Sequence, residues 1–211
     1  GITRYHKIVE RTDYLLQVLR QATRILLSPN AGPVLLSLPY NIQKELVEES
    51  LLDDIRFVTE AAHICNSFAA TEEMGRMIRE AQHPVIVAGH GCFIAEAQDV
   101  LQKLGERHAI RVATSLKGKG LIAESDPRAL GCLGVTSDGS AFRHIVAHAD
   151  LIIVLGAGFN ERTSNLWDPK LMAGKRVIQV DHDAKQLEKV FKADLVIHGD
   201  IRAVLEDLLI C

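Results

Sequence analysis

An unbroken apolar run that ends in two glycines is the feature that most restricts how this chain can fold. Residues 149–162 read ADLIIVLGAGFNER, in which positions 151–155 carry only apolar side chains and Gly156 and Gly158 follow. A short apolar run bounded by turn residues is typical of a strand covered on both faces, as in a parallel sheet. Because open α/β sheets bind ligands beyond the carboxyl ends of their strands, the two glycines mark a candidate binding edge.

A second stretch has the same form earlier in the chain. Residues 84–91 read PVIVAGHG, an apolar run that ends at Gly89 and Gly91. Glycine allows the backbone to approach a phosphate, so two strands that end in Gly-x-Gly predict one nucleotide-sized crevice. The alternative is a tight turn without a ligand. Ile94 stands where the dinucleotide fingerprint has its third glycine, which disfavours a standard NAD site.

The first 70 residues predict too little structure to bury a core of their own. A helix at 13–28, with Thr12 or Asp13 as its N-cap, precedes a short buried strand at 34–38. A connector follows, with one short extended piece at 55–58. One helix and one strand bury little apolar surface, so this segment either packs on the rest of the chain or is a helix-strand fragment of a neighbouring α/β domain whose start is missing.

From residue 71 the pattern alternates regularly between strands and helices. Strands are predicted at 85–88, 110–114, 151–155, 177–180 and 195–198. Helices, with proposed N-caps in parentheses, are predicted at 71–81 (Thr71), 95–107, 137–148 (Ser137 or Asp138), 184–190 and 200–209 (Asp200). The predicted fold class is therefore α/β, a Rossmann-like parallel sheet with helices on both faces.

Composition excludes several classes of function. A net charge of −3 gives no reason to expect nucleic acid or an anionic membrane as a partner. No apolar run approaches the ~20 residues that span a bilayer, and the N-terminus lacks the apolar region of a signal peptide. The four cysteines show no CxxC spacing, so we expect reduced thiols in a cytoplasmic protein. The chain begins at Gly1, and we expect a piece of a longer polypeptide.

Three charged side chains follow predicted strands and are candidates for nucleotide contacts. Lys117 lies in the loop LKGKG, where its charge could neutralise a phosphate. The alternative is a solvated loop that binds no ligand. Arg162 offers a guanidinium that can hold a phosphate bidentately, unless it pairs with Glu161 or an aspartate at the surface. Asp181 either binds ribose hydroxyls or closes a turn.

Other reactive side chains are interpreted as structural. His144 and His148 have the i, i+4 spacing of a two-histidine metal site, but the sequence shows no third ligand. Cys92 has no activating base nearby in the sequence and is expected to be a small buried side chain. We therefore expect no catalytic and no metal-binding residue in this chain.

Seven motifs together resemble one family, the thiamine-diphosphate-dependent enzymes of the acetolactate synthase type. In chain order they are GPVLLSLP at 32–39, HPVIVAGHG at 83–91, LKGKG at 116–120, LGCLG at 130–134, ADLIIVLGAGFNER at 149–162, VDHD at 180–183 and HGD at 198–200. The resemblance implies three α/β domains in the parent enzyme. Residues 1–50 would end the pyrimidine-binding domain and begin the linker, residues 51–70 would continue the linker, and residues 71–211 would be the central domain.

The resemblance also implies a function for the parent protein. Such an enzyme uses thiamine diphosphate and Mg²⁺ on 2-oxo acids, as a transferase or lyase that performs acetolactate synthase-like carboligation or decarboxylation. The activating glutamate and the GDG…N motif of the family are missing from these residues, so the piece alone is expected to be inactive. Its expected partners are the missing domains of the same polypeptide and a second copy, with a dimer forming through residues 1–50.

Within the family, the central domain of acetolactate synthases holds FAD in a structural role. The contacts carried over by the resemblance are Gly89, Gly91, Ser115, Leu116, Lys117, Gly134, Val135, Gly156, Ala157, Gly158, Asn160, Arg162, Asp181 and Asp200. The family's GARFDDR is GAGFNER here, which removes an arginine at Gly158 and a carboxylate at Asn160. FAD, ADP, a CoA adenylate and an empty crevice therefore all stay open.

Two other functions compete with this interpretation. A self-standing nucleotide-binding or regulatory module without catalysis would share the fold. A sirtuin-like NAD-dependent deacylase is disfavoured, because the cysteines lack paired zinc spacing and no catalytic histidine motif is recognisable.

Overall fold

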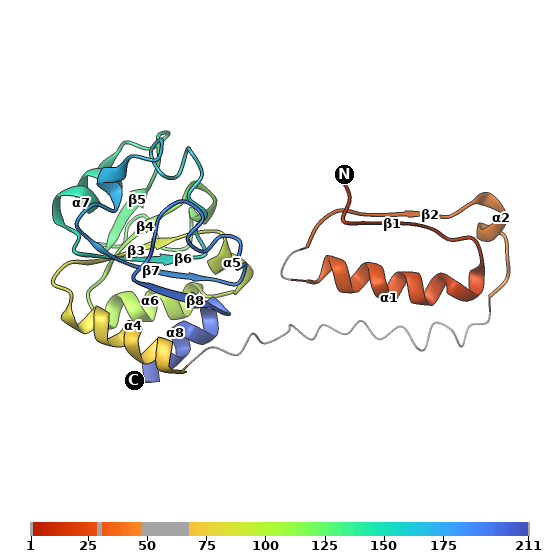
Figure 1. Ribbon diagram of the computed structural model, residues 1–211, viewed down its shortest axis with the longest axis horizontal. Helices are drawn as coiled ribbons and strands as arrows, with labels where there is room; N and C mark the ends of the chain where they lie inside the picture. The colour runs from red at the N-terminus through yellow and green to blue at the C-terminus, as the bar shows by residue number, and fades with distance from the viewer. Residues whose placement is uncertain (1, 29–30, 48–67, 211) are drawn as a thin grey trace. The chain divides into compact units, whose positions relative to one another are not determined.

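The computed structural model describes residues 2–28, 31–47 and 68–210 (Figure 1). The chain divides into two compact units, Gly1–His63 and Ile64–Cys211. The extended piece predicted at 55–58 lies outside the described residues.

The first unit is a small βαβ arrangement. Strands β1 (Tyr5–Ile8) and β2 (Val34–Ser37) pair in parallel, with α1 (Leu15–Leu26) between them in the chain and α2 (Tyr40–Gln43) after them. Strand β1 was missing from the sequence prediction, because YHKI has neither an apolar run nor flanking glycine or proline. Its parallel pairing turns the expected helix-strand fragment into a strand-helix-strand unit.

The core of this first unit is small, and two predictions about it were wrong. Val9, Val18 and Ile42 are its fully buried members. The strand expected to be buried leaves Leu35 49% exposed. Neither predicted N-cap acts as one, because helix α1 begins only at Leu15 and residues 12–14 form a 3₁₀ turn, in which Thr12 donates its hydroxyl to Glu45 at 2.9 Å.

The second unit is built on one fully parallel six-stranded sheet. Its strands lie in the order β5-β4-β3-β6-β7-β8, so the chain first builds outward from β3 and then returns to the other side of it. The strands are β3 (Pro84–Ala88), β4 (Arg111–Thr114), β5 (Ala129–Cys132), β6 (Leu151–Leu155), β7 (Arg176–Asp181) and β8 (Leu195–His198). This is the doubly wound order in which ligands bind where the direction of building reverses, here between β3 and β6.

Helices cover both faces of the sheet, as expected (Figure 1). Helices α4 (Phe68–Glu80), α6 (Gln98–Arg107) and α8 (Ile201–Ile210) pack on one face. On the other face, α7 (Ser140–His148) and the segment after β6 cover the second core cluster. Strand β6 is buried along its whole length, as its unbroken apolar run predicted. Among the described residues, no helix has both the length and the apolar character needed to cross a membrane.

Several helix boundaries differ from the prediction. Helix α4 already includes Phe68, so Thr71 is an interior residue that is 1% exposed and not an N-cap. The helix expected from 95 begins at Gln98, because Glu96 has a φ of +49° that interrupts it after the short helix α5 (Gly91–Ile94).

The remaining caps show one confirmation and one correction. Asp200 caps α8, since its carboxylate accepts a hydrogen bond from the Ala203 amide at 2.9 Å. Helix α7 starts at Ser140 after Gly139 with a φ of +76°, so neither Ser137 nor Asp138 is the N-cap residue. The Asp138 carboxylate nevertheless accepts from the Ser140 amide at 3.0 Å.

One predicted helix does not form, and one strand was missed. Residues 184–190 form turns, because the Glu188 amide donates to the Gln179 side chain at 2.6 Å and Glu188 has a φ of +50°. Strand β5, with the sequence ALGC, lacks the apolar run that identified the other strands. A strand at the edge of the sheet needs less apolar surface than a central one.

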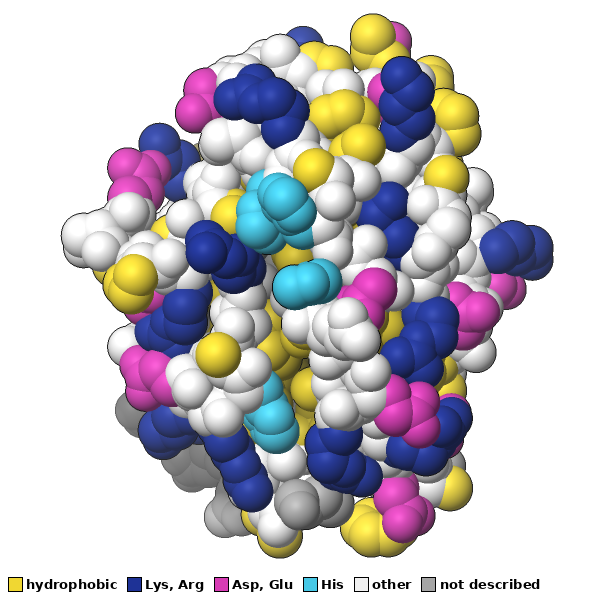
Figure 2. Space-filling view, turned by 90° about the vertical axis from the view of Figure 1, so that its left-hand side faces the viewer, with side chains coloured by type: hydrophobic (Ala, Val, Ile, Leu, Met, Phe, Trp, Pro, Cys, Tyr) yellow, Lys and Arg dark blue, Asp and Glu magenta, His cyan; other side chains and the backbone are white. Residues whose placement is uncertain are grey.

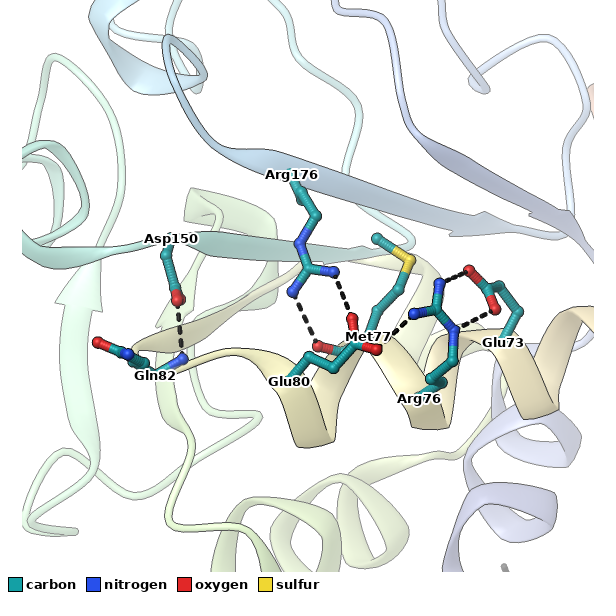
Figure 3. Close-up of polar contacts among 7 residues, drawn as sticks. All are labelled: Glu73, Arg76, Met77, Glu80, Gln82, Asp150 and Arg176. Carbon is teal, nitrogen blue, oxygen red and sulfur yellow. Dashed lines mark hydrogen bonds and ion pairs between the residues drawn. The ribbon is translucent and has the colours of Figure 1, made fainter.

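A network of polar contacts joins the end of α4 to the start of β7 (Figure 3). Arg176 donates to the Glu80 carboxylate at 3.0 Å and to the Met77 carbonyl at 3.4 Å. Arg76 pairs with both Glu73 and Glu80 on the outer side of α4. These contacts anchor the carboxyl end of α4 to the sheet.

Asp150 holds the turn that leads into β3. Its carboxylate accepts hydrogen bonds from the backbone amides of Gln82 at 2.7 Å and His83 at 2.9 Å, and the first of these is drawn in Figure 3. Burial acts to raise the pKa of Asp150, but these hydrogen bonds outweigh it and hold the pKa below its usual value. The charged carboxylate therefore stabilises the start of two central strands.

Replacing Asp150 by asparagine tests this contribution. We expect Asp150→Asn to lower the free energy of unfolding by about 1 kcal/mol at neutral pH, measured by urea denaturation. Because the folded pKa is lowered, the stabilisation is present above the unfolded pKa of about 3.9 and is lost as the pH falls through the folded pKa. The difference between the two proteins should thus shrink in acid. Asp207→Asn is the control, since no hydrogen bond of the Asp207 side chain is found in the described residues; equal losses for both variants would contradict the prediction.

Candidate functional site

The two glycine pairs meet at the carboxyl edge of the sheet, as the sequence predicted. Strands β3 and β6 are direct neighbours, with Ala88 opposite Leu155. Beyond them, the Gly89 amide donates to the Leu155 carbonyl at 2.8 Å and the Gly91 amide donates to the Gly156 carbonyl at 3.0 Å. The two turns are therefore hydrogen-bonded to each other at the point where the strand order reverses.

Glycine is required here because the two backbones touch. A Cβ atom on Gly89 would lie 2.2 Å from the Gly156 carbonyl oxygen and 2.4 Å from the Ala157 Cα. Gly156 has a φ of +57°, and a Cβ there would lie 2.5 Å from the Gly91 Cα. No side chain fits between the turns.

A crevice of about 410 Å³ opens above these turns and draws its lining from both sides of the reversal point. The predicted residues that line it are Gly91, Ser115, Leu116, Lys117, Gly156, Gly158, Asn160, Arg162 and Asp181. The sequence analysis missed His90, Ile94, Thr163, His182, Asp183 and Gln186, which also line it. Five of these six lie within three positions of a predicted residue, so they could have been found by including the neighbours of each predicted residue. The sixth, Gln186, lies within the helix that was wrongly predicted at 184–190.

The other predicted residues lie behind the lining. Gly89 and Ala157 form the contact between the turns, and Asp200 caps α8. Gly134 and Val135 hold the backbone of Arg162: the Val135 amide donates to the Arg162 carbonyl at 3.0 Å. Gly134 has a φ of +131°, and a Cβ there would lie 2.5 Å from the same carbonyl oxygen, so this contact also requires glycine.

Two cations line the crevice together with the carboxylates of Asp181 and Asp183. Within the described residues, the side chains of Lys117 and Arg162 make no ion pair or hydrogen bond, so the surface pair considered for Arg162 does not form. Lys119, two positions along the same loop, pairs with Glu124 at 2.9 Å. The crevice therefore presents two cations without ion-pair partners beside glycine turns that carry no side chain, and these cations suit an anionic group of a ligand.

Asp181 lies at the end of β7 and is 6% exposed. Its carboxylate accepts a hydrogen bond from the Asp183 amide at 2.9 Å and lies 3.4 Å from the His182 imidazole. Burial raises the pKa of Asp181, and the Asp183 amide offsets part of that effect. The turn role considered for Asp181 is confirmed, while its ribose contact stays a prediction.

Cys92 is the small buried side chain that the sequence predicted. Cys92 is fully buried, its thiol lies 3.4 Å from the Leu155 carbonyl, and burial raises the pKa of the thiol to about 12, so no thiolate forms at neutral pH. The rings of His144 and His148 stack 4.9 Å apart on α7. Across the described part of the chain, no three His, Cys, Asp or Glu side chains are grouped to hold a metal ion.

Comparison with known families accounts for this arrangement. Residues 71–208 match the family model for the central domain of thiamine pyrophosphate enzymes. The chain belongs to this family.

Curated relatives extend the match to both units. The chain is 29% identical over 208 residues to the acetolactate synthase isozyme 1 large subunit of Escherichia coli, with 99% of this chain and 36% of that protein covered. It is 30% identical over 213 residues to the acetolactate synthase large subunit of Cyanidium caldarium, again over 99% of this chain and 36% of the relative. The chain thus spans about a third of the length of these relatives.

A solved structure has the same fold. It is that of a Mycobacterium smegmatis protein provisionally assigned as a thiamin diphosphate-dependent enzyme, with a TM-score of 0.73 and 20% identity. The match covers 98% of this chain and 38% of the other. The fold class expected from the sequence is therefore confirmed.

The contact between the two glycine turns can be tested by matched alanine variants. We expect Gly89→Ala to lower the free energy of unfolding by about 3 kcal/mol, because overpacked backbone must move apart. Gly158→Ala is the control: the nearest atom to its Cβ is the end of the flexible Gln186 side chain at 3.1 Å. Urea denaturation of both variants measures the difference, and equal stability would contradict the packing argument.

Proposed function

We propose that the crevice binds an adenine nucleotide through its diphosphate and ribose. The observation that carries this proposal is that Lys117 and Arg162, which make no ion pair among the described residues, lie beside the glycine turns at the reversal point of the sheet. Both features favour a diphosphate, since turns without side chains leave room for the phosphate oxygens and the cations neutralise them. The location agrees with the general rule for doubly wound sheets.

The residues lining the crevice divide into roles by chemistry. Gly91 and Gly156 would leave room for the diphosphate, with Lys117 and Arg162 on its charge. Asp181 would accept hydrogen bonds from ribose hydroxyls at the end of β7. The predicted residues that do not line the crevice would support those that do, as Gly134 and Val135 do for Arg162.

The size of the crevice favours ADP over FAD. Its volume of about 410 Å³ is near the lower end of the ~300–1,000 Å³ typical of ligand pockets. A nucleoside diphosphate matches this volume, whereas FAD adds a flavin and ribityl chain. Gly158 and Asn160 also bring no charge where the family pattern has an arginine and a carboxylate.

Calorimetric titration with ADP tests the proposal. We expect saturable binding, with FAD weaker than ADP, and a parallel change in the fluorescence of Trp167, the sole tryptophan of the chain. Lys117→Gln and Arg162→Gln should each weaken ADP binding about tenfold or more, because each removes a charge-assisted contact.

Lys119→Gln is the matched control for Lys117→Gln. It removes the same charge from the same loop, but Lys119 already pairs with Glu124 outside the crevice lining. The affinity of the Lys119→Gln variant for ADP should stay close to that of the unaltered protein. No heat with ADP or FAD, or equal losses in Lys117→Gln and Lys119→Gln, would overturn the assignment.

For the whole protein we propose a thiamine-diphosphate- and Mg²⁺-dependent enzyme acting on 2-oxo acids, by acetolactate synthase-like carboligation or by decarboxylation. In this proposal residues 1–50 complete a pyrimidine-binding domain, residues 51–70 are a linker, and residues 71–211 are the central domain, which supplies no catalytic residue. In this proposal the cofactor and its metal bind on other domains of the protein. Consumption of pyruvate by the full-length protein only when both cofactors are present would support this proposal. A full-length protein that consumes no pyruvate with both cofactors would contradict it.

The proposal includes assembly of two copies through residues 1–50. The first unit leaves several large apolar side chains exposed, including Leu26 at 50%, Leu27 at 52% and Leu35 at 49%. Apolar surface of this kind is usually covered by a partner. Sedimentation velocity over a range of concentrations measures this assembly.

A further inference from the structure

Three helices end together at the amino edge of the sheet, opposite the crevice. Helices α4 and α6 each precede a strand, and α8 follows the last one, so their carboxyl ends lie where the parallel strands begin. Helix α8 packs against both α4 and α6. Figure 2 looks onto this side of the molecule, where histidines lie among lysine and arginine side chains.

A small cavity of about 90 Å³ lies between these helix ends. Gly75, Ile78 and Leu208 form its apolar part, and the side chains of Arg79, Arg107 and His108 line the rest. This volume exceeds the ~10–15 Å³ of such space that a single water molecule needs, so the cavity has room for a small ion.

The charges around the cavity are all of one sign. No carboxylate belongs to its lining within the described residues. Arg107 donates to the Leu209 carbonyl, and the Arg79 guanidinium has no ion pair or hydrogen bond in the described parts of the chain. One arginine is thus held by a neutral acceptor, and the other has spare donors.

The shape of α4 keeps Arg79 at this cavity. Gly75 lies one turn before Arg79, and a Cβ on Gly75 would lie 3.2 Å from an Arg79 guanidinium nitrogen and 3.4 Å from a Leu208 methyl carbon. The absence of a side chain at Gly75 therefore gives the guanidinium room to fold back along the helix.

His108 is influenced by both arginines. Partial burial lowers the pKa of His108, and the positive charges of Arg107 and Arg79 lower it further. Both arginines are therefore close enough for their charges to act on the His108 imidazole. A bound anion would offset those charges and favour the imidazolium form.

Cations near helix carboxyl ends also have a simpler explanation, because the helix dipole attracts them. The Arg107 contact with Leu209 is of that kind. It does not explain a cavity lined by two guanidinium groups and an imidazole.

We infer that this cavity is an anion site for phosphate or a phosphomonoester, held by Arg79, Arg107 and His108. The site is separate from the crevice, since the two share no lining residue and lie at opposite edges of the sheet. Two guanidinium groups suit tetrahedral oxyanions because each can donate two parallel hydrogen bonds. The imidazolium would add a third donor at lower pH.

NMR of the histidine ring protons tests the inference on the full chain. The His108 signal is identified by its loss in His108→Gln and followed during titration with inorganic phosphate at constant ionic strength set by chloride. We expect a saturable shift and a higher His108 pKa in phosphate than in chloride. The same titration with glycerol 3-phosphate distinguishes a phosphomonoester from free phosphate, because the ligand that saturates the shift at the lower concentration is the better occupant. Acetate should bind more weakly than either.

Variants separate this site from other positive charge. Arg79→Gln should raise the phosphate dissociation constant about tenfold or more, since it removes a charge-assisted contact. Lys103→Gln is the control, because it removes a cation from α6 that pairs with Asp99 at 3.6 Å outside the cavity lining, and it should leave phosphate binding unchanged. The absence of a saturable response, or an equal loss in Arg79→Gln and Lys103→Gln, would overturn the inference.

Discussion

The contact between the Gly89–Gly91 turn and Gly156 is the constraint on which the rest of this protein depends. These backbones approach so closely that a Cβ on either turn would overlap the backbone of the other turn. The contact exists because β3 and β6 are neighbours at the centre of the sheet, and they are neighbours because the chain reverses its direction of building there. This close packing excludes side chains from the two turns. The same arrangement therefore joins the halves of the sheet and forms the floor of the crevice.

The central strands could be predicted from the sequence because burial on both faces leaves only apolar side chains. Strand β6 is the clearest case: its predicted and observed bounds are identical. Strands β1 and β5 were missed because neither carries an apolar run. Helix starts were also unreliable, since candidate caps such as Thr12 have other partners in the fold and Glu188 and Glu96 adopt positive φ. Such choices depend on contacts between distant residues, which local patterns do not contain.

The candidate site was predicted in outline for a similar reason. Topology alone brings the ends of neighbouring parallel strands together, so residues after β3, β4, β6 and β7 had to share one edge. The sequence could not distinguish residues that line the crevice from residues that hold the lining residues in place. Gly134 and Val135 appear in the same motif set as Arg162, yet they act on its backbone from behind. Gln186 lines the crevice without belonging to any motif, and His90 lies inside a motif but was not among the predicted contacts. The cavity between Arg79, Arg107 and His108 was also outside sequence reasoning, because it joins three helix ends that are distant in the chain.

The support that Gly134 and Val135 give to Arg162 has a consequence for how this fold can diversify. These two residues follow the edge strand β5, whereas Arg162 follows the central strand β6. Edge segments accept insertions and deletions more readily than central ones do. A change of length after β5 would therefore displace a guanidinium without altering any residue that faces the crevice. Descendants of one ancestor could in this way gain or lose a bound anion while their glycine turns stayed the same.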